Sequence, residues 1–343
     1  MKVLAPIRSL DELEMLVASG AEELYCGVAP REWMERYGGA VWLNRRSPKG
    51  GSLETYTELK QLVDAAHGLH LPVFITLNAP YYSAEQMPLV LDMAHRLSGE
   101  VGVDALIVTD INLLIRLSEE KLAAALHTSS VAATLNTEAV RFLLNFGVRR
   151  IILPRSLTIS EIAAIVNAVR GQVEIEVFML NDGCAFEEGF CATTHHHSVG
   201  AFCTSLSEMR AEFEWDGPIF TSRRQKWLAR NLADYREWVW YLNGSGCNST
   251  PKGLPYGPCG LCAIPDFQRI GIDSLKIVGR EASPLKKLAS VKMVRDIVDR
   301  ARAGTPKLHV IERAIALRET PEYCASGYMC YYKVEGAGNT FRQ

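Results

Sequence analysis

The chain has 343 residues, a length that fits about two domains of 150 residues or one large α/β barrel. Apolar residues make up 48% and charged residues 22%, values of ordinary globular chains, so extensive disorder and fibrous architectures are excluded. With 37 basic and 39 acidic residues, the formal net charge of -2 argues against nucleic acid as the main partner. Neither a signal peptide nor a run of about 18 apolar residues is visible, so we expect a cytoplasmic chain without a membrane span.

Short apolar or β-branched runs alternate with helical patterns along most of the chain. The expected strands are 2–6, 22–27, 72–77, 104–109, 123–128, 149–154, 173–180 and 273–278. The expected helices are 9–19, 54–68, 84–98, 136–146, 158–169, 222–242, 284–302 and 308–318, and a further short helix is expected to begin at 264. Eight such repeats favour a TIM-like (β/α)8 barrel over an open doubly wound sheet, because no glycine-rich turn follows the first strand.

Two of these helices carry more specific expectations. Ser9 and Glu12 have the spacing of a capping box at the start of helix 9–19. The helix over 222–242 is amphipathic, and its aromatic and basic residues leave open whether it packs on the barrel, contacts a partner or binds RNA.

The rhythm of strands and helices divides the chain into four parts. Residues 1–180 supply the first seven strands of the barrel, and 263–303 supply the last barrel units. Between them, 181–262 form a long cysteine-rich insertion after the seventh strand, and 304–343 form a tail that we expect to dock on the barrel because it is rich in Tyr, Met and Cys. In a TIM-like barrel such an insertion lies at the catalytic, carboxyl-terminal face.

Nine cysteines in a chain expected to be cytoplasmic point to metal ligands, reactive thiols or small core residues rather than disulfides. Cys26 lies in an apolar strand and is expected to be a core residue. Six cysteines fall between 184 and 262, and two more lie near the end of the sequence. Taken alone, the C-x6-C spacing of the first two in the insertion is a weak metal signal.

Residues around that pair resemble peptidase family U32. In the family signature a Glu-x-Phe strand end runs into C-x4-G-x-C, and this chain matches it with Glu176, Phe178, Cys184, Gly189 and Cys191. The segments 127–162 and 261–280 are also similar to the family, and the resemblance covers about residues 1–300.

The family includes oxygen-independent hydroxylases that act in the ubiquinone pathway or on RNA bases, and the resemblance implies a [4Fe-4S] cluster held by four cysteines. By position, Cys184, Cys191 and Cys262 match three ligands. Cys203 is the expected remaining ligand, with Cys247 or Cys259 as alternatives. A second metal site made by Cys247, Cys259, Cys324 and Cys330 is left open.

Other polar residues near strand ends are candidate catalytic or substrate-binding groups, and His127 and Asn78 are expected to project toward the carboxyl-terminal face of the barrel. Arginine and lysine side chains there suit a carboxylated substrate, because they pair with carboxylates inside a partly dry pocket. The catalytic candidates are His127, Arg155, Lys276 and Arg280, and the substrate-binding candidates are Arg45, Asn78, Glu176 and His195. For each of them, a structural salt bridge or a satisfied polar group is the alternative.

Together these observations and the resemblance predict an iron-sulfur-dependent, oxygen-independent hydroxylase or related redox enzyme. Its substrate is expected to be a small aromatic or isoprenoid-type molecule, with an anionic oxygen donor such as prephenate. The alternatives are a non-catalytic, cluster-bearing subunit of such a hydroxylase, a U32-type peptidase, and an RNA base hydroxylase. The sequence leaves open a homo-oligomer or a hetero-oligomer with another U32-type subunit. A peptidase ranks last, because no zinc-peptidase motif or Ser/His/Asp order is visible.

Overall fold

The computed structural model describes residues 1–38, 41–184, 188–191, 217, 220–245, 248–327 and 329–332. Eight parallel strands close into a barrel in chain order, and the first strand pairs with both the second and the last. They are β1 (Lys2–Pro6), β2 (Glu23–Cys26), β3 (Val73–Leu77), β4 (Ala105–Val108), β5 (Ala125–Thr128), β6 (Val148–Ile152), β7 (Glu174–Leu180) and β8 (Ser274–Ile277). The predicted TIM-like barrel is therefore confirmed.

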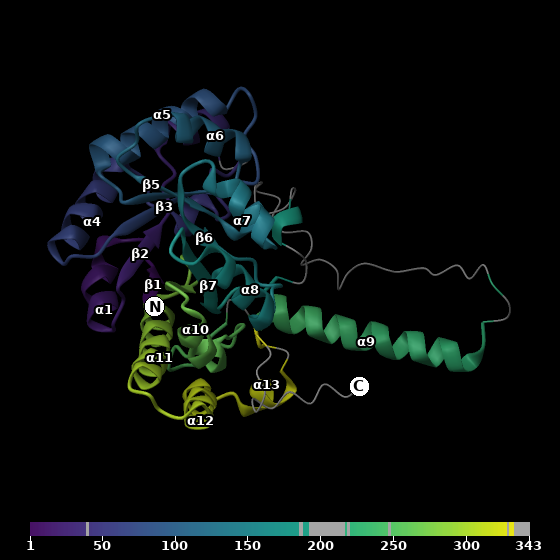
Figure 1. Cartoon of the computed structure of the whole chain (residues 1–343). Helices are drawn as coiled ribbons and strands as arrows, with labels where there is room; N and C mark the ends of the chain where they lie inside the picture. Colours follow the sequence, from purple (N-terminus) through teal and green to yellow (C-terminus); the bar gives the residue numbers. More distant parts are fainter. Residues whose placement is uncertain are drawn as a thin grey trace.

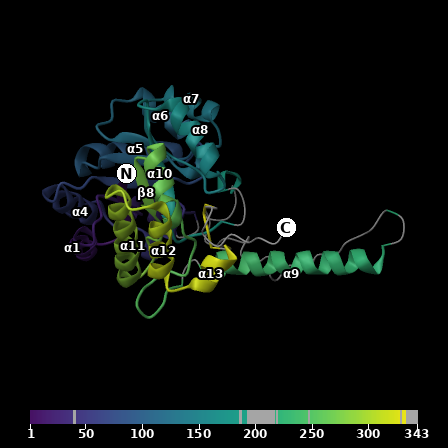
Figure 2. The same cartoon turned by 60° about the horizontal axis from the view of Figure 1, so that its bottom comes forward.

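Helices surround the barrel (Figure 1). They are α1 (Leu13–Ala18), α2 (Arg31–Tyr37), α3 (Pro48–Gly51), α4 (Tyr56–Gly68), α5 (Met87–Arg96), α6 (Ile111–Glu119), α7 (Thr137–Leu144), α8 (Ile159–Val169), α9 (Ser222–Ser245), α10 (Ile264–Ile270), α11 (Pro284–Arg302), α12 (Lys307–Arg318) and α13 (Pro321–Ser326). Figure 2 shows α11 and α12 side by side on the barrel, in agreement with Figure 1. Helices α2, α3, α6 and α13 were not among the predicted elements.

The strands are buried on both faces, which explains why they read as continuous apolar runs rather than alternating patterns. One large core lies between the strands and the helices. A smaller core fills part of the barrel interior with Leu4, Tyr25, Phe74, Ala105, Ile107, Ile152, Phe178 and Val278. The remaining interior carries charged side chains, described below.

The predicted capping box at Ser9 is wrong. Ser9 makes no side-chain cap, and the Glu12 carboxylate instead accepts hydrogen bonds of 3.0 and 2.8 Å from the buried Lys287 Nζ. A buried ammonium needs a paired carboxylate, and this need outweighs the benefit of an exposed cap. Capping boxes do form at Thr55 in front of α4 and at Thr158 in front of α8.

Helix α9, the predicted helix over 222–242, extends away from the barrel in both views (Figures 1 and 2). Trp227 on this helix is 65% exposed, and Leu228 and Leu232 are only half-buried. Its described apolar residues therefore do not pack into the core of the barrel. Across the described part of the chain, no helix combines the length and the apolar character needed to cross a membrane.

The end of the described chain lies against the loop that follows α9. The backbone N–H of Cys259 donates to the Met329 carbonyl over 2.6 Å, and the Tyr331 N–H donates to the Cys259 carbonyl over 2.9 Å. Met329 and Tyr332 are buried, and the Tyr332 ring packs edge-on against Phe267 with 4.8 Å between centroids. Backbone pairing and apolar burial thus hold this segment on the protein.

Candidate active site at the barrel mouth

The carboxyl ends of the strands form the barrel mouth, where active sites of this fold class lie. Four arginines reach this region from the segments that follow β2, β6 and β8: Arg45, Arg46, Arg155 and Arg280. Their hydrogen-bond and ion-pair partners differ. Among the described residues, Arg46 and Arg155 pair with carboxylates, whereas Arg280 does not and is available to bind an anion.

Arg280 is the buried cation whose partners are neutral. Its guanidinium donates to Thr76 Oγ1 over 2.9 Å and to Asn44 Oδ1 over 2.8 Å, and the residue is 4% exposed. Within the ranges that the structure covers, it forms no ion pair with a carboxylate. Burial lowers the pKa of Arg280 to about 10, so it stays protonated at neutral pH. A buried, unmatched cation at the mouth is suited to bind an anion.

Gly27, directly after β2, makes room for Arg280. A Cβ atom at this position would overlap Arg280 Nη1 and would stand 2.9 Å from Asn44 Nδ2. We expect Gly27→Ala to lower the free energy of unfolding by about 1–3 kcal/mol, because the side chains must shift to relieve the overlap. Urea unfolding measures this loss. Gly68→Ala is the matched control, since nothing lies within 4 Å of its added Cβ; equal effects of the two variants would contradict the steric argument.

Arg155 and Arg46 already have carboxylate partners. Arg155 forms an ion pair with Glu188, and its guanidinium carbon lies 3.7 Å from the centre of the Phe178 ring. Arg46 pairs with Asp182. Both ion pairs link the segments after β2 and β6 to the start of the insertion. These two arginines therefore stabilise the structure of the mouth and do not offer an unpaired charge to a ligand.

Two thiols of the insertion lie near Arg45, a half-buried residue. Burial lowers the pKa of Arg45, and the electrostatic influence of the nearby Cys191 and Cys184 side chains opposes that shift. The Arg45 backbone N–H donates to Asn78 Oδ1 over 3.4 Å, and Asn78 Nδ2 donates to Ser129 Oγ over 3.3 Å. Loops after β2, β3, β5 and β7 are thus brought together around a cation with two partly exposed thiols.

The other cysteines are distributed differently from the set that the resemblance implied. Cys262 lines a separate small cavity with Cys259, Cys324 and Cys330, rather than joining Cys184 and Cys191. None of the seven cysteines that the structure describes forms a disulfide. Among described residues, no three His, Cys, Asp or Glu side chains are grouped as around a metal ion. The predicted residues Cys203, Cys247 and His195 lie outside the described residues.

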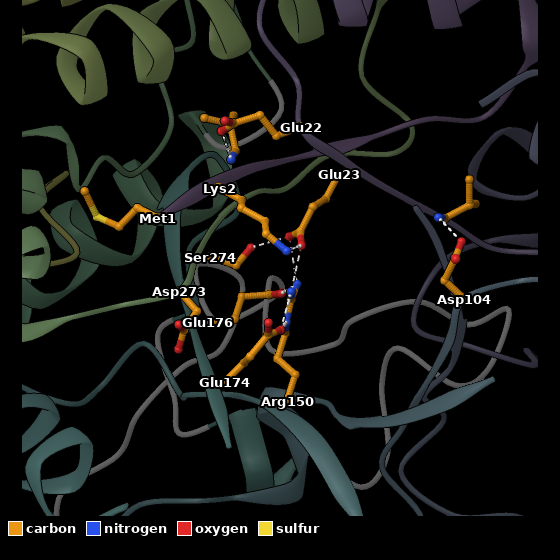
Figure 3. A network of polar contacts seen from close by, with 12 residues as sticks. Met1, Lys2, Glu22, Glu23, Asp104, Arg150, Glu174, Glu176, Asp273 and Ser274 are labelled. Atoms are coloured by element: carbon orange, nitrogen blue, oxygen red, sulfur yellow. Dashed lines mark hydrogen bonds and ion pairs between the residues drawn. The ribbon is translucent and has the colours of Figure 1, made fainter. Parts of the chain in front are cut away.

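Two predicted site residues, Lys276 and Glu176, lie inside the barrel instead of at its mouth. Lys276 Nζ donates to Glu176 Oε1 over 2.8 Å and stands 4.1 Å from the centre of the Tyr25 ring. Glu176 also accepts from Arg150 over 3.2 Å (Figure 3). Since Lys276 and Glu176 neutralise each other in a buried position, neither offers a free charge to a substrate.

His127 faces the opposite end of the barrel from the mouth. It lines a cavity of about 610 Å³ with Lys2, Glu23 and other residues from the amino-terminal ends of the strands. Burial, followed by the charges of Arg150 and Lys276, holds the pKa of His127 well below its usual value, so the ring is neutral at pH 7. The expectation that it projects toward the mouth is wrong, because its side chain points inward below the rim.

Several residues of the mouth were not predicted from the sequence. Asn44 and Thr76 hold Arg280, and Glu188 holds Arg155. Thr76 alternates with outward-facing apolar residues in β3, a pattern that could have marked it as an interior polar group. Nothing in the local sequence around Asn44 or Glu188 signals their partners, which come from distant segments.

The fold and the site define a parallel (β/α)8 barrel protein whose mouth carries thiols and a buried, unmatched cation. The family model of Peptidase family U32 matches residues 8–338, so the chain belongs to peptidase family U32. This confirms the resemblance seen in the sequence. A solved U32 peptidase structure aligns with a TM-score of 0.41 at 18% identity, over 64% of this chain and 82% of that one.

Curated relatives fall into two groups. An uncharacterised protease of Methanocaldococcus jannaschii is 24% identical over 100% of this chain and 78% of its own length. The tRNA hydroxylation protein P1 of Bacillus subtilis is 25% identical over 91% of this chain and 66% of its own length. The tRNA hydroxylation protein P of Escherichia coli is 27% identical over 55% of this chain. The chain spans only 38% of that protein's length.

Proposed function

We propose that this chain is an oxygen-independent hydroxylase that uses an iron-sulfur cluster and an anionic oxygen donor such as prephenate. The observation that carries the proposal is the combination at the mouth of two thiols, a half-buried Arg45 beside them and a buried Arg280 without a carboxylate partner. The names of the relatives, which include hydroxylation proteins for tRNA, support this class of reaction.

The two described thiols at the mouth are of the residue type that ligates an iron-sulfur cluster. Cys184 and Cys191 would be two of its ligands, and Cys203 and Cys247 are the cysteines that remain once Cys26 and the separate group of four are set aside. A cluster with four thiolates carries net negative charge, which a nearby cation such as the half-buried Arg45 would stabilise. When bound, such a cluster supplies one-electron redox chemistry at the mouth.

The residues of this chain bind and orient the reactants in this proposal. Arg280 would pair with a carboxylate of the oxygen donor, while Thr76 and Asn44 keep the guanidinium fixed in direction.

An RNA base is the second candidate substrate. Helix α9 extends from the barrel with Arg223, Arg224 and Lys226 exposed on its first turns, next to the exposed Trp227. Basic side chains interleaved with an aromatic ring are suited to contact phosphates and unstacked bases.

The proposal is tested by purifying the protein without oxygen and measuring iron and acid-labile sulfide. We expect about four irons per chain, lost in Cys184→Ala and Cys191→Ala and kept in Cys26→Ala, whose thiol is buried in β2. The wild-type protein is then incubated with prephenate and either a small aromatic acceptor or unmodified tRNA, and mass spectrometry detects an added oxygen atom. Oxygen on tRNA would favour the second candidate, and a protein without iron and sulfide would contradict both.

A further inference from the structure

Four cysteines form a group of their own, distinct from the pair at the mouth. Cys259 and Cys262 belong to the loop before α10, Cys324 belongs to α13, and Cys330 follows α13. All four line one cavity of about 20 Å³, which is also bordered by the buried Arg318. Two pairs of thiols more than 60 positions apart in the sequence therefore meet at one place.

Main-chain hydrogen bonds hold these two segments together. The Cys259 N–H and carbonyl bond to Met329 and Tyr331 over 2.6 and 2.9 Å, so that Cys330 lies directly beside Cys259 in a parallel pair. The Gly260 N–H donates to the Met179 carbonyl over 2.7 Å, which fixes the C-x2-C loop to the end of β7. The convergence of the thiols is thus set by the backbone.

Arg318 beside these thiols lacks an anionic partner. It is 1% exposed and donates to the carbonyls of Gly257 and Tyr256 over 2.8 and 3.2 Å, while its Nε has no hydrogen-bond partner. In the described chain no carboxylate pairs with it. Burying an unmatched guanidinium is costly, and thiolates would supply the missing negative charge.

We propose that Cys259, Cys262, Cys324 and Cys330 bind one Zn²⁺ ion that fastens the C-terminal segment to the barrel. Four thiolates with a C-x2-C pair are a frequent ligand set of structural zinc. A cavity of about 20 Å³ has room for a single ion, since a water molecule needs roughly 10–15 Å³ on this measure, and a four-iron cluster is much larger.

Binding requires a small rearrangement of side chains. The described residues contain no ready-made group of three metal ligands, so the thiols must rotate into the cavity to reach the Zn–S distance of about 2.3 Å. Each cysteine releases its thiol proton on binding, and the resulting site has a net charge of two minus. Arg318 then has the counter-charge that the metal-free arrangement lacks.

Metal analysis of the full chain tests this proposal. We expect about one zinc per chain in the protein purified without chelators, lost in both Cys324→Ser and Cys330→Ser and kept in Cys26→Ala. Cys184→Ser is expected to lose mouth iron and to keep the zinc, so failure of the hydroxylase proposal and failure of this one are distinguishable. Zinc retained in both tail variants, or wild type without zinc, would overturn the proposal.

A second measurement needs no variant. In the wild-type protein, labelling with N-ethylmaleimide followed by peptide mass spectrometry is expected to leave Cys324 and Cys330 unmodified until a zinc chelator is added. Rapid labelling of both before chelation would overturn the site. Acid-labile sulfide that disappears in Cys330→Ser would show an iron-sulfur cluster in its place and would overturn the zinc assignment.

Discussion

Arg150→Met is expected to lower the free energy of unfolding by about 3–5 kcal/mol at pH 7, because it leaves buried carboxylates without their partner. The Arg150 guanidinium lies 2.7 Å from Glu23, 2.6 Å from Glu174 and 3.2 Å from Glu176 (Figure 3). The side chains of Glu23 and Glu176 are fully buried. Arg149→Met on the same strand is the matched control, since Arg149 is exposed and its replacement should change stability by less than about 0.5 kcal/mol.

The loss in Arg150→Met should depend on pH. Burial opposes ionisation of Glu23, but hydrogen bonds and charge from Arg150 prevail and hold the pKa of this carboxyl below its ordinary value of 4.5. A lowered pKa stabilises the fold above the unfolded-state value and stops doing so as the pH falls through the folded-state value. Urea unfolding should therefore show the largest difference between wild type and variant near pH 7 and a smaller one below about pH 4.5. A difference independent of pH would contradict this account.

Arg280→Met is expected to give the opposite result: nearly unchanged stability and a large loss of anion binding. Its hydrogen-bond partners keep other contacts, since Thr76 Oγ1 donates to the Cys26 carbonyl over 3.2 Å and Asn44 Oδ1 accepts from the Arg46 N–H over 3.0 Å. The free energy of unfolding should stay within about 1 kcal/mol of wild type, because the variant also removes a buried charge.

Arg280→Met should strongly lower the affinity of the protein for the anion. Removing a buried cation that pairs with a ligand carboxylate costs about 2–5 kcal/mol, or roughly 30- to 5000-fold in Kd. Isothermal titration with prephenate measures this change, and Arg46→Met serves as the comparison, because Arg46 is already paired with Asp182. Equal prephenate affinity in wild type and Arg280→Met would remove Arg280 from the binding site.

The barrel was predictable because its strands are local and strongly patterned. Each expected strand overlaps an observed one, since runs such as 72–77 are apolar throughout and bounded by turn residues. Helix α6 was missed even though Asp110 caps it, because it directly follows a buried strand and the two read as one apolar stretch. The Ser9 capping box failed because a distant lysine, Lys287, competes for Glu12.

The site was harder to predict, since charge pairing depends on side chains far apart in the sequence. Arg155, Lys276 and Arg280 look alike as basic residues after or within strands, yet Glu188 and Glu176 neutralise the first two. The grouping of Cys262 with Cys324 depends on how the C-terminal segment returns to the barrel, which spacing alone does not reveal.

Closure of the barrel through β1 and β8 also has a consequence for synthesis on the ribosome. Lys2 pairs with Ser274, so the first strand lacks one neighbour until about 270 more residues have been made, which takes roughly 14–54 s at about 5–20 residues per second. During this interval β1 exposes an unpaired edge, a feature that favours association between nascent chains. Slow translation of the second half of the gene should therefore increase aggregation of the newborn protein and its dependence on chaperones.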